Sequence, residues 1–106
     1  MITVYITCSK KKEAKEIAGA LLKKRLVACT NIIPIDTMYW WNDEILEEDG
    51  FAIIGKTIDN KFADIEKEVK KHHSFAVPCI TAWPIIHVSD DYSQWATGEI
   101  AIGKKE

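Results

Sequence analysis

The fold of this chain is decided by the stretch from Arg25 to Trp41, which reads RLVACTNIIPIDTMYWW. It starts at the basic end of an expected helix, continues as a strand that carries Cys29, and ends on Tyr39, Trp40 and Trp41. Successive side chains of a strand point to opposite faces. At least one of these aromatic residues therefore leaves the core of its own domain. Large exposed aromatic side chains usually mark a surface that a partner covers.

Hydrophobic periodicity around this stretch predicts four strands and two main helices in the order β-α-β-β-α-β. The strands are expected at about 2–7, 26–33 with a continuation through 38–41, 51–58 and 77–83, and the helices at about 13–24 and 61–71. Pro34 is expected to interrupt the second strand. Asn42-Asp43-Glu44 has turn chemistry, so the second and third strands should form a long hairpin. A short helix from Ser89 and a short final strand at Ile100-Ala101-Ile102 complete the prediction.

This order predicts an α+β protein with the split β-α-β, or ferredoxin-like, arrangement in a single domain spanning residues 1–106. Two helices would cover one face of a four-stranded antiparallel sheet. The strands are apolar on both faces, however: in the fourth strand Cys79 and Trp83 point one way, while Ile80 and Ala82 point the other. We therefore expect the second face to be covered by other copies of the chain.

The charge balance excludes several kinds of partner. The chain has 14 Lys and Arg against 16 Asp and Glu, a net charge of −2 and a pI of about 5.9. We therefore expect neither nucleic acid nor an acidic membrane surface as a general partner. No secretory leader and no apolar run of about 20 residues is visible, which predicts a cytoplasmic protein. Cys8, Cys29 and Cys79 are odd in number and far apart, so we expect free thiols.

No catalytic motif stands out, and we expect that the protein is not an enzyme. The sequence has no Ser/His/Asp grouping, no glycine-rich phosphate loop and no closely spaced acid pair. Acylphosphatase-type chemistry would suit the fold, but the loop after the first strand lacks the glycines that cradle a phosphate. An RNA-binding module shares the topology, but the aromatic platform motif of that class is missing.

The residues that best suit a metal ion are Cys8, His72 and His73. A thiol and two imidazoles are ligands for copper or zinc. The alternative is that Cys8 is a small buried apolar residue and that the histidines form an exposed helix end, where protonated imidazoles are favourable. The spacing contains no C-x-x-C or H-x₃-H motif, and the three groups could also meet only across a subunit boundary.

Five motifs in this order resemble the CutA divalent-cation tolerance family. They are Arg25–Asn31, Tyr39-Trp40-Trp41, Lys56-Thr57, His73 with Val77-Pro78, and Asp91–Trp95. The resemblance extends over about 2–95 and implies a ferredoxin-like protomer in a homotrimer, with its long hairpin extending against a neighbour. It also implies a link to heavy-metal tolerance, copper binding in some members, and a likeness to the trimeric PII signalling proteins. The thiol that ends the first strand and the paired histidines have been associated with copper in the family, which would make Cys8, His72 and His73 the ligands here.

Two departures from the family pattern concern the metal hypothesis. Family members usually read His-Pro-Tyr before the Val-Pro, whereas this chain has Ser74-Phe75-Ala76 after His73. The loop Ser9–Lys12 is short and basic, and positive charge disfavours a nearby cation.

Two hypotheses follow from these patterns. The first is a cytoplasmic homotrimer for tolerance of divalent metals that binds Cu²⁺ or a similar cation. The second is a PII-like signalling or scaffold trimer that binds a small molecule or protein at subunit clefts and has no physiological metal. In either case the candidate cleft or interface residues are Arg25, Cys29, Tyr39, Trp40, Trp41, Lys56, Tyr92 and Trp95.

Overall fold

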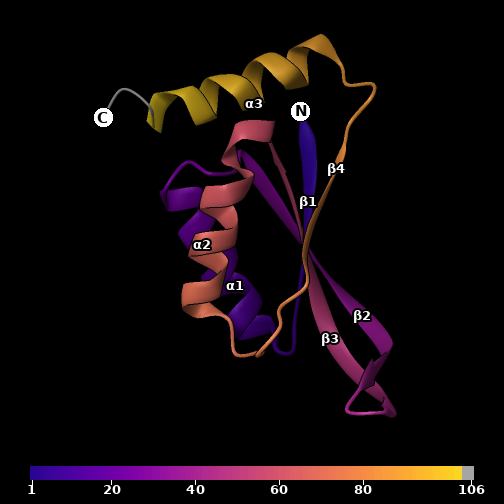
Figure 1. Ribbon diagram of the computed structural model, residues 1–106. Coiled ribbons are helices and arrows are strands. Elements are labelled where there is room, and N and C mark those ends of the chain that lie inside the picture. Colours follow the sequence, from indigo (N-terminus) through magenta and orange to yellow (C-terminus); the bar gives the residue numbers. More distant parts are fainter. Residues whose placement is uncertain (104–106) are drawn as a thin grey trace.

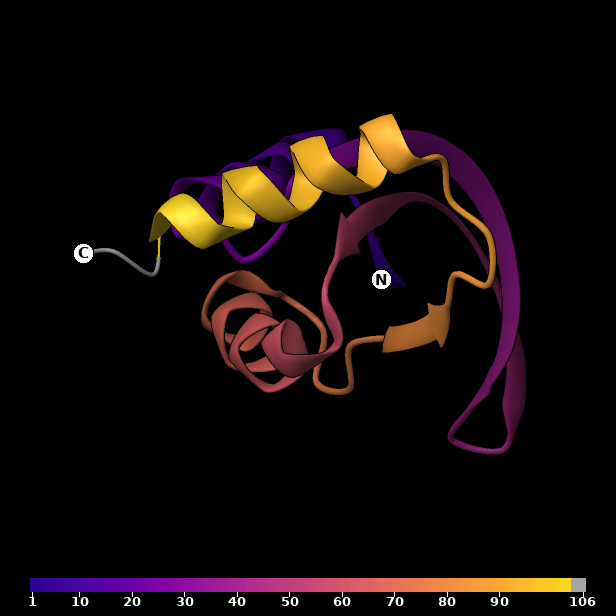
Figure 2. The same cartoon turned by 90° about the horizontal axis from the view of Figure 1, so that it is seen from above.

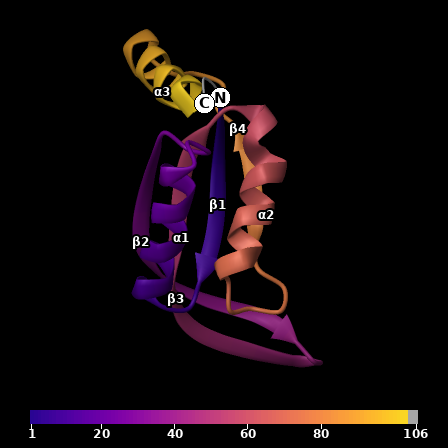
Figure 3. The same cartoon turned by 90° about the vertical axis from the view of Figure 1, so that its left-hand side faces the viewer.

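The computed structural model describes residues 1–103, and their side chains as far as Ala101. The elements follow one another as β1 (Ile2–Cys8), α1 (Lys11–Lys23), β2 (Cys29–Trp41), β3 (Glu44–Thr57), the 3₁₀ turn η1 (Asp59–Lys61), α2 (Phe62–His72), β4 (Ile80–Pro84) and α3 (Asp90–Gly103) (Figure 1). The four strands form one antiparallel sheet in the order β2-β3-β1-β4. Helices α1 and α2 lie side by side on one face of it (Figure 3). The predicted α+β, ferredoxin-like arrangement is confirmed.

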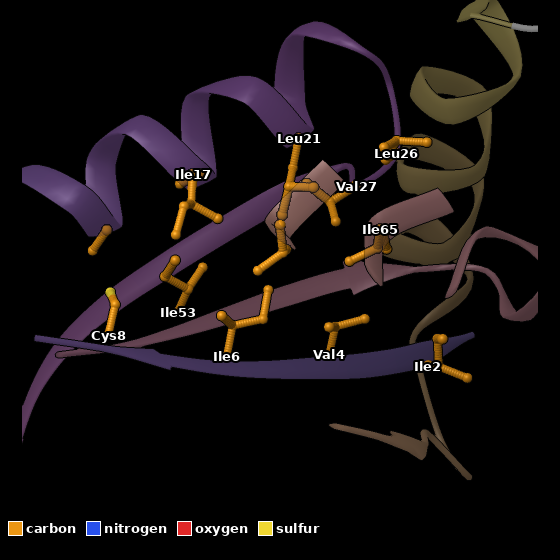
Figure 4. Packing of buried hydrophobic residues seen from close by; sticks show 13 residues of the cluster. Ile2, Val4, Ile6, Cys8, Ile17, Leu21, Leu26, Val27, Ile53 and Ile65 are labelled. Atoms are coloured by element: carbon orange, nitrogen blue, oxygen red, sulfur yellow. The ribbon is translucent and has the colours of Figure 1, made fainter. Parts of the chain in front are cut away.

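The core fills the space between these two helices and the sheet (Figure 4). Ile6 on β1 lies opposite Ile53 on β3, and both point into the layer between sheet and helices, where Ile53 faces Ile17 of α1. Leu21 of α1 and Ile65 of α2 belong to the same cluster. Ile53 and Ile65 are 0% exposed. Each fully buried side chain of this size stabilises the fold by about 1.5–3 kcal/mol relative to an exposed one. The apolar stripes of α1 and α2 together therefore bury one face of the sheet.

The link from α1 to β2 is a helix end that uses an arginine where glycine is usual. Arg25 has φ 58°, the Arg25 N–H donates to Leu22 O, and the Leu26 N–H donates to Leu21 O. These two bonds form a Schellman motif with Arg25 in the left-handed position. The buried Thr57 hydroxyl then donates to Leu26 O at 2.6 Å and fixes the start of the next segment. The motif turns the chain sharply and directs Val27 into the core.

The hairpin of β2 and β3 is much longer than the rest of the sheet. The two strands pair from Cys29 opposite Lys56 to Trp41 opposite Glu44, while β1 ends opposite Phe51. The turn residues Asn42 and Asp43 have φ 50° and 65°, as a two-residue type I′ turn requires. Residues 35–50 therefore continue beyond the sandwich as a twisted two-stranded arm (Figure 2).

Several details of the sequence prediction are wrong. Strand β2 begins at Cys29 and not at Leu26, and β3 begins at Glu44 and not at Phe51. Pro34 does not interrupt β2, because β2 is an edge strand, where a residue without an N–H is tolerated. Strand β4 begins at Ile80 and not at Val77. The residues Ile100-Ala101-Ile102 are helical and not a strand, and α3 has 14 residues and is not short.

Burial explains why α3 is long. Ala96 and Ile100 lie one turn apart on α3, and both are buried against the end of the sandwich that the helix crosses in Figure 1. Gly98 lowers helix propensity by about 1 kcal/mol. That cost is smaller than the gain of about 1.5–3 kcal/mol from burying an isoleucine. Tertiary packing therefore outweighs the local preference that the sequence suggested.

Candidate functional site

Cys8 ends β1 on the helix-covered face and is 2% exposed. The Cys8 Sγ lies 3.9 Å from Lys10 O. Burial, and then the nearby Glu13 carboxylate, raise the pKa of Cys8 to about 11. Metals bind the thiolate and not the thiol. Cys8 is therefore a protonated, buried thiol at neutral pH, and a metal could use it only by displacing that proton.

His73 follows α2 and is held by two hydrogen bonds. Its Nδ1 accepts the Phe75 N–H at 3.1 Å, so the proton of the neutral ring is on Nε2, which donates to Thr7 O at 2.6 Å. The Phe75 ring packs against it with centroids 4.9 Å apart. These contacts bring His73 close to the end of β1, because Thr7 directly precedes Cys8. They also occupy both ring nitrogens, so neither offers a free lone pair to a metal.

His72 points into a different cluster, which is centred on Glu68 of α2. The His72 Nε2 is 3.1 Å from Glu68 Oε2, and Lys24 Nζ of α1 is 2.7 Å from Glu68 Oε1. Lys71 joins at 3.3 Å. The hydrogen bonds from Lys24 and then His72 lower the pKa of Glu68 to about 2. His72 thus takes part in an ion cluster that joins α2 to α1.

The three predicted metal ligands therefore do not converge within one chain. Among residues 1–103, no three His, Cys, Asp or Glu side chains are arranged to hold a metal ion. Cys8 and His73 are neighbours in space through Thr7, but the first is protonated and the second has both nitrogens engaged. The residues do not fit a preformed copper site in this arrangement of a single chain.

The predicted cleft or interface residues fall into two groups. The first lies where α3 meets the start of β2: the Cys29 Sγ and the Tyr92 hydroxyl are 2.7 Å apart. Burial, and then Cys29, raise the pKa of Tyr92 to about 12. The Tyr92 and Trp95 rings have centroids 5.7 Å apart, and Lys56 lies opposite Cys29 in the β2–β3 pair. This group fastens α3 to the sheet.

Arg25, which follows α1, makes a second attachment to α3. Its Nη1 donates to Glu99 O at 3.1 Å and to Glu99 Oε2 at 2.6 Å. Both side chains of this ion pair are more than a third exposed, so its own contribution to stability is small, about 0–1 kcal/mol. The pair positions the helix more than it strengthens the fold.

The second group is on the hairpin and lines a groove of about 680 Å³. Tyr39, Trp40 and Trp41 contribute to it from β2, Tyr5 from β1, and Phe75 from the segment between α2 and β4. This volume is typical of small-molecule pockets. Cys8 and Cys79 also touch its wall.

Most groove residues were missed by the sequence analysis, Glu48, Asp49 and Phe75 among them. A signal for the first two was present, because the hairpin carries consecutive acids and no basic residue between Asn31 and Gly55. In the sequence, Phe75 stands out only as part of a departure from the family's His-Pro-Tyr pattern. Its place beside the hairpin depends on the packing of the loop after α2, which no local pattern indicates.

Comparison with known proteins agrees with this architecture. The family described as "CutA1 divalent ion tolerance protein" matches residues 2–99. The chain belongs to the CutA1 family. Within residues 1–103, no helix of this CutA1 family member is long and apolar enough to cross a membrane.

Relatives of this CutA1 family member come from distant organisms. It is 44% identical over 92 residues to the divalent-cation tolerance protein CutA of Archaeoglobus fulgidus, covering 87% of this chain and 90% of that protein. The solved structure of the A. fulgidus CutA, named as periplasmic, has a TM-score of 0.92 at 40% identity and covers 94% of this chain and 99% of that one. The crystal structure of CutA1 from Pyrococcus horikoshii has a TM-score of 0.88 at 31% identity, with 93% and 97% covered. A chloroplastic CutA of Oryza sativa is 33% identical over 95 residues, which cover 89% of this chain and 54% of that protein.

Proposed function

We propose that this protein acts as a homotrimer in tolerance of divalent metal ions. The observation that carries the proposal is the match to the CutA1 family over residues 2–99, because it covers both the sandwich and the whole hairpin arm. Relatives in several organisms bear the name divalent-cation tolerance protein. The assembly and the metal each need their own argument and test.

Exposed apolar side chains support the assembly. Trp83 on β4 and Ile33 on β2 point to the sheet face opposite α1 and α2, and both are exposed in the single chain. On the arm, Trp40 is 71% exposed and Met38 is 68% exposed. A monomer that exposes this many large apolar side chains is unusual. Light scattering should give three times the 12.0 kDa chain mass, whereas a monomer at micromolar concentration would refute the trimer.

Copper binding is the finer part of the proposal, and Cys8, His72 and His73 are its candidate ligands. In the arrangement seen here His73 would have to give up its bonds to Thr7 and Phe75, and Cys8 its proton. Binding through these groups should therefore release protons and weaken as the pH falls.

Calorimetric titration with Cu²⁺ tests this assignment. We expect the double variant Cys8→Ala/His73→Ala to lose at least about tenfold in affinity, while Cys79→Ala, which removes an exposed thiol, keeps the wild-type affinity. Equal affinities in the wild type and the double variant would remove Cys8 and His73 as ligands. Heat changes measured in buffers of different protonation enthalpy would count the released protons.

Two further statements remain predictions from the sequence. We place the protein in the cytoplasm, although the A. fulgidus relative is named as periplasmic and the rice relative as chloroplastic. We also propose a binding role without catalysis. Fractionation of the native cells would test the first, and a screen for turnover of phosphate and carboxylate esters would test the second.

A further inference from the structure

The base of the hairpin arm places two carboxyl groups directly across from each other. Asp36 of β2 lies opposite Asp49 of β3, and both residues are exposed in the single chain. Opposite residues of an antiparallel pair have Cβ atoms about 4.5–5.5 Å apart, and like charges at this distance oppose the pairing of the strands. A hydrogen bond to the Asp49 carboxyl, and then the charge of Asp49, raise the pKa of Asp36. The pair therefore favours a state in which the two carboxyls share one proton.

A third carboxylate lies on the same face of the arm, and the chain supplies no cation to balance the three. Side chains alternate along a strand, so Glu47 points to the side of Asp49, whereas Glu48 points to the opposite side. The charge of Glu47 adds to the repulsion that acts on Asp36. Within residues 1–103, no lysine, arginine or histidine forms an ion pair with any of these three carboxylates. The whole segment between Asn31 and Gly55 contains no basic residue.

The pair lies where the arm leaves the sandwich. Gly50, the residue after Asp49, passes so close to β1 that a Cβ on it would lie 2.7 Å from Cys8 O. Farther out, β3 has only β2 beside it, so the arm depends on the pairing of these two strands. By alternation, Met38 and Trp40 share the face of Asp36, and they are 68% and 71% exposed. Strand pairing at this point therefore affects how firmly the arm presents its apolar surface.

We propose that Asp36 and Asp49 form a proton-sensitive switch at the base of the arm. At neutral pH the two carboxylates repel each other and weaken the pairing of β2 with β3. As the pH falls, the pair takes up one proton and shares it, so the strands pair more firmly and the arm is better ordered for association. The effect on association rests on the proposed trimer, whereas the change in strand pairing occurs within one chain.

The arm and the sandwich should respond to acid in opposite directions. A carboxyl whose pKa is raised in the folded arm binds its proton more tightly there than in the opened arm. The arm therefore gains stability as the pH falls through the raised pKa of Asp36 toward its ordinary value of 3.8. The sandwich loses stability in acid, because the pKa of Glu68 is lowered to about 2. Glu68 stays ionised between about pH 7.5 and about pH 4.5, so this range separates the two responses.

Hydrogen exchange of the arm amides tests the switch in the native assembly. Protection factors for residues 35–50 are measured from about pH 7.5 to about pH 4.5, with EDTA present to remove divalent metal ions. We expect protection to rise at least about threefold toward the acid end. Asp36→Asn carries an amide that can donate to the Asp49 carboxylate at any pH. This variant should show the higher protection already at neutral pH, with little further rise in acid.

Glu44→Gln is the matched control. It removes the same charge from the same arm, but Glu44 lies opposite Trp41 beside the turn and points to the other face. The control should keep the pH dependence of the wild type. Both variants retain His72 and His73, so the titration of these histidines cannot cause a difference between them. A loss of pH dependence in Glu44→Gln as large as in Asp36→Asn would overturn the assignment to the pair.

Light scattering in the same buffers tests the effect on assembly. The wild type should dissociate at a lower protein concentration near pH 4.5 than near pH 7.5, and Asp36→Asn should show a smaller difference. An association that does not change with pH would overturn the effect on assembly.

The wild-type exchange profile decides the switch itself. Arm protection that stays constant or falls in acid would overturn it, and a lysine of a neighbouring copy facing the pair would produce such a fall. A profile of Asp36→Asn identical to that of the wild type would overturn it as well. A chain that stays monomeric but shows the rise in arm protection would refute the trimer and support the switch, so the two proposals fail separately.

Discussion

The two sides of this molecule treat similar apolar residues in opposite ways. On the helix-covered face of the sheet, Ile53 is 0% exposed and packs between two helices and a neighbouring strand. On the hairpin arm, Ile45 is 58% exposed and Trp40 more so. Both regions belong to the same strand pair, since β3 passes from the core into the arm at about Phe51.

The difference shows that one strand can serve two purposes along its length. The inner half of β3 is buried because β1 flanks it and α1 packs on it. The outer half has only β2 beside it, and an isolated two-stranded ribbon is at best marginally stable in water. The arm therefore needs another surface to cover it, whereas the sandwich does not. Changes in the arm should alter association, and changes in the sandwich should alter folding.

The largest effect is expected from Trp41→Asp, which places a charge on a surface that should be dry. Removal of a tryptophan anchor typically costs at least about 2 kcal/mol of association free energy, and burial of an unpaired charge adds to it. We expect the mass measured by light scattering to fall from three times 12.0 kDa toward 12.0 kDa. Circular dichroism should show that the sandwich remains folded. A variant that stays fully assembled would remove Trp41 from the interface.

Ile53→Ala should have the next largest effect, and it should act on folding. Truncation of a fully buried isoleucine costs about 2–5 kcal/mol of unfolding free energy, measured by urea denaturation. The comparison is Ile45→Ala on the arm, which should change the unfolding free energy by less than about 0.5 kcal/mol in dissociated protein. Equal losses in the two variants would contradict the division between arm and sandwich.

Gly50→Ala tests the junction between the two regions. A Cβ at Gly50 would lie 2.7 Å from Cys8 O, which is part of the backbone at the end of β1. The strands must move apart to relieve this clash, at a cost of about 1–3 kcal/mol in unfolding free energy. Gly19→Ala on α1 is the control, because no atom outside the neighbouring backbone of the helix lies within 4 Å of its added methyl group. That variant should keep or raise stability by up to about 1 kcal/mol.

The smallest effect concerns the pH dependence of the sandwich. The folded-state pKa of Glu68 is about 2, below its ordinary value of 4.5. The ionised form is therefore favoured by folding, so its contribution is present above about pH 4.5 and is lost as the pH falls toward 2. Glu68→Gln should remove this part of the acid dependence of Tm.

Glu66→Gln provides the control for that experiment. It breaks the exposed i,i+4 pair with Lys70, whose side chains are 3.2 Å apart, and should change stability by less than about 0.5 kcal/mol. Identical acid profiles in the Glu68→Gln variant and the wild type would show that the Lys24–Glu68–His72 cluster does not couple folding to pH.

Much of the architecture could be predicted because local patterns are strong where one face of an element is buried. The stripes of α1 and α2 and the alternation of β1 repeat at the period of their element, and Asn42-Asp43 has the residue types of a tight turn. The prediction was wrong at Ile100-Ala101-Ile102 because alternation over three residues does not distinguish a strand from the end of a helix. The candidate site was harder still, since Phe75 and Glu48 are far apart in sequence and meet only in the folded chain.

The sequence by itself determined the order of the main elements, the position of the hairpin turn and the apolar surplus on its arm, because periodicity and turn chemistry are local properties. Only the tertiary structure decided how the residues between Arg25 and Trp41 divide: Arg25 and Cys29 fasten α3, while Tyr39 and Trp41 line a groove with Phe75. It also decided that Cys8 is a protonated thiol and that His73 uses both nitrogens. Burial and hydrogen-bond partners come from segments distant in sequence, so they exist only once the chain has packed.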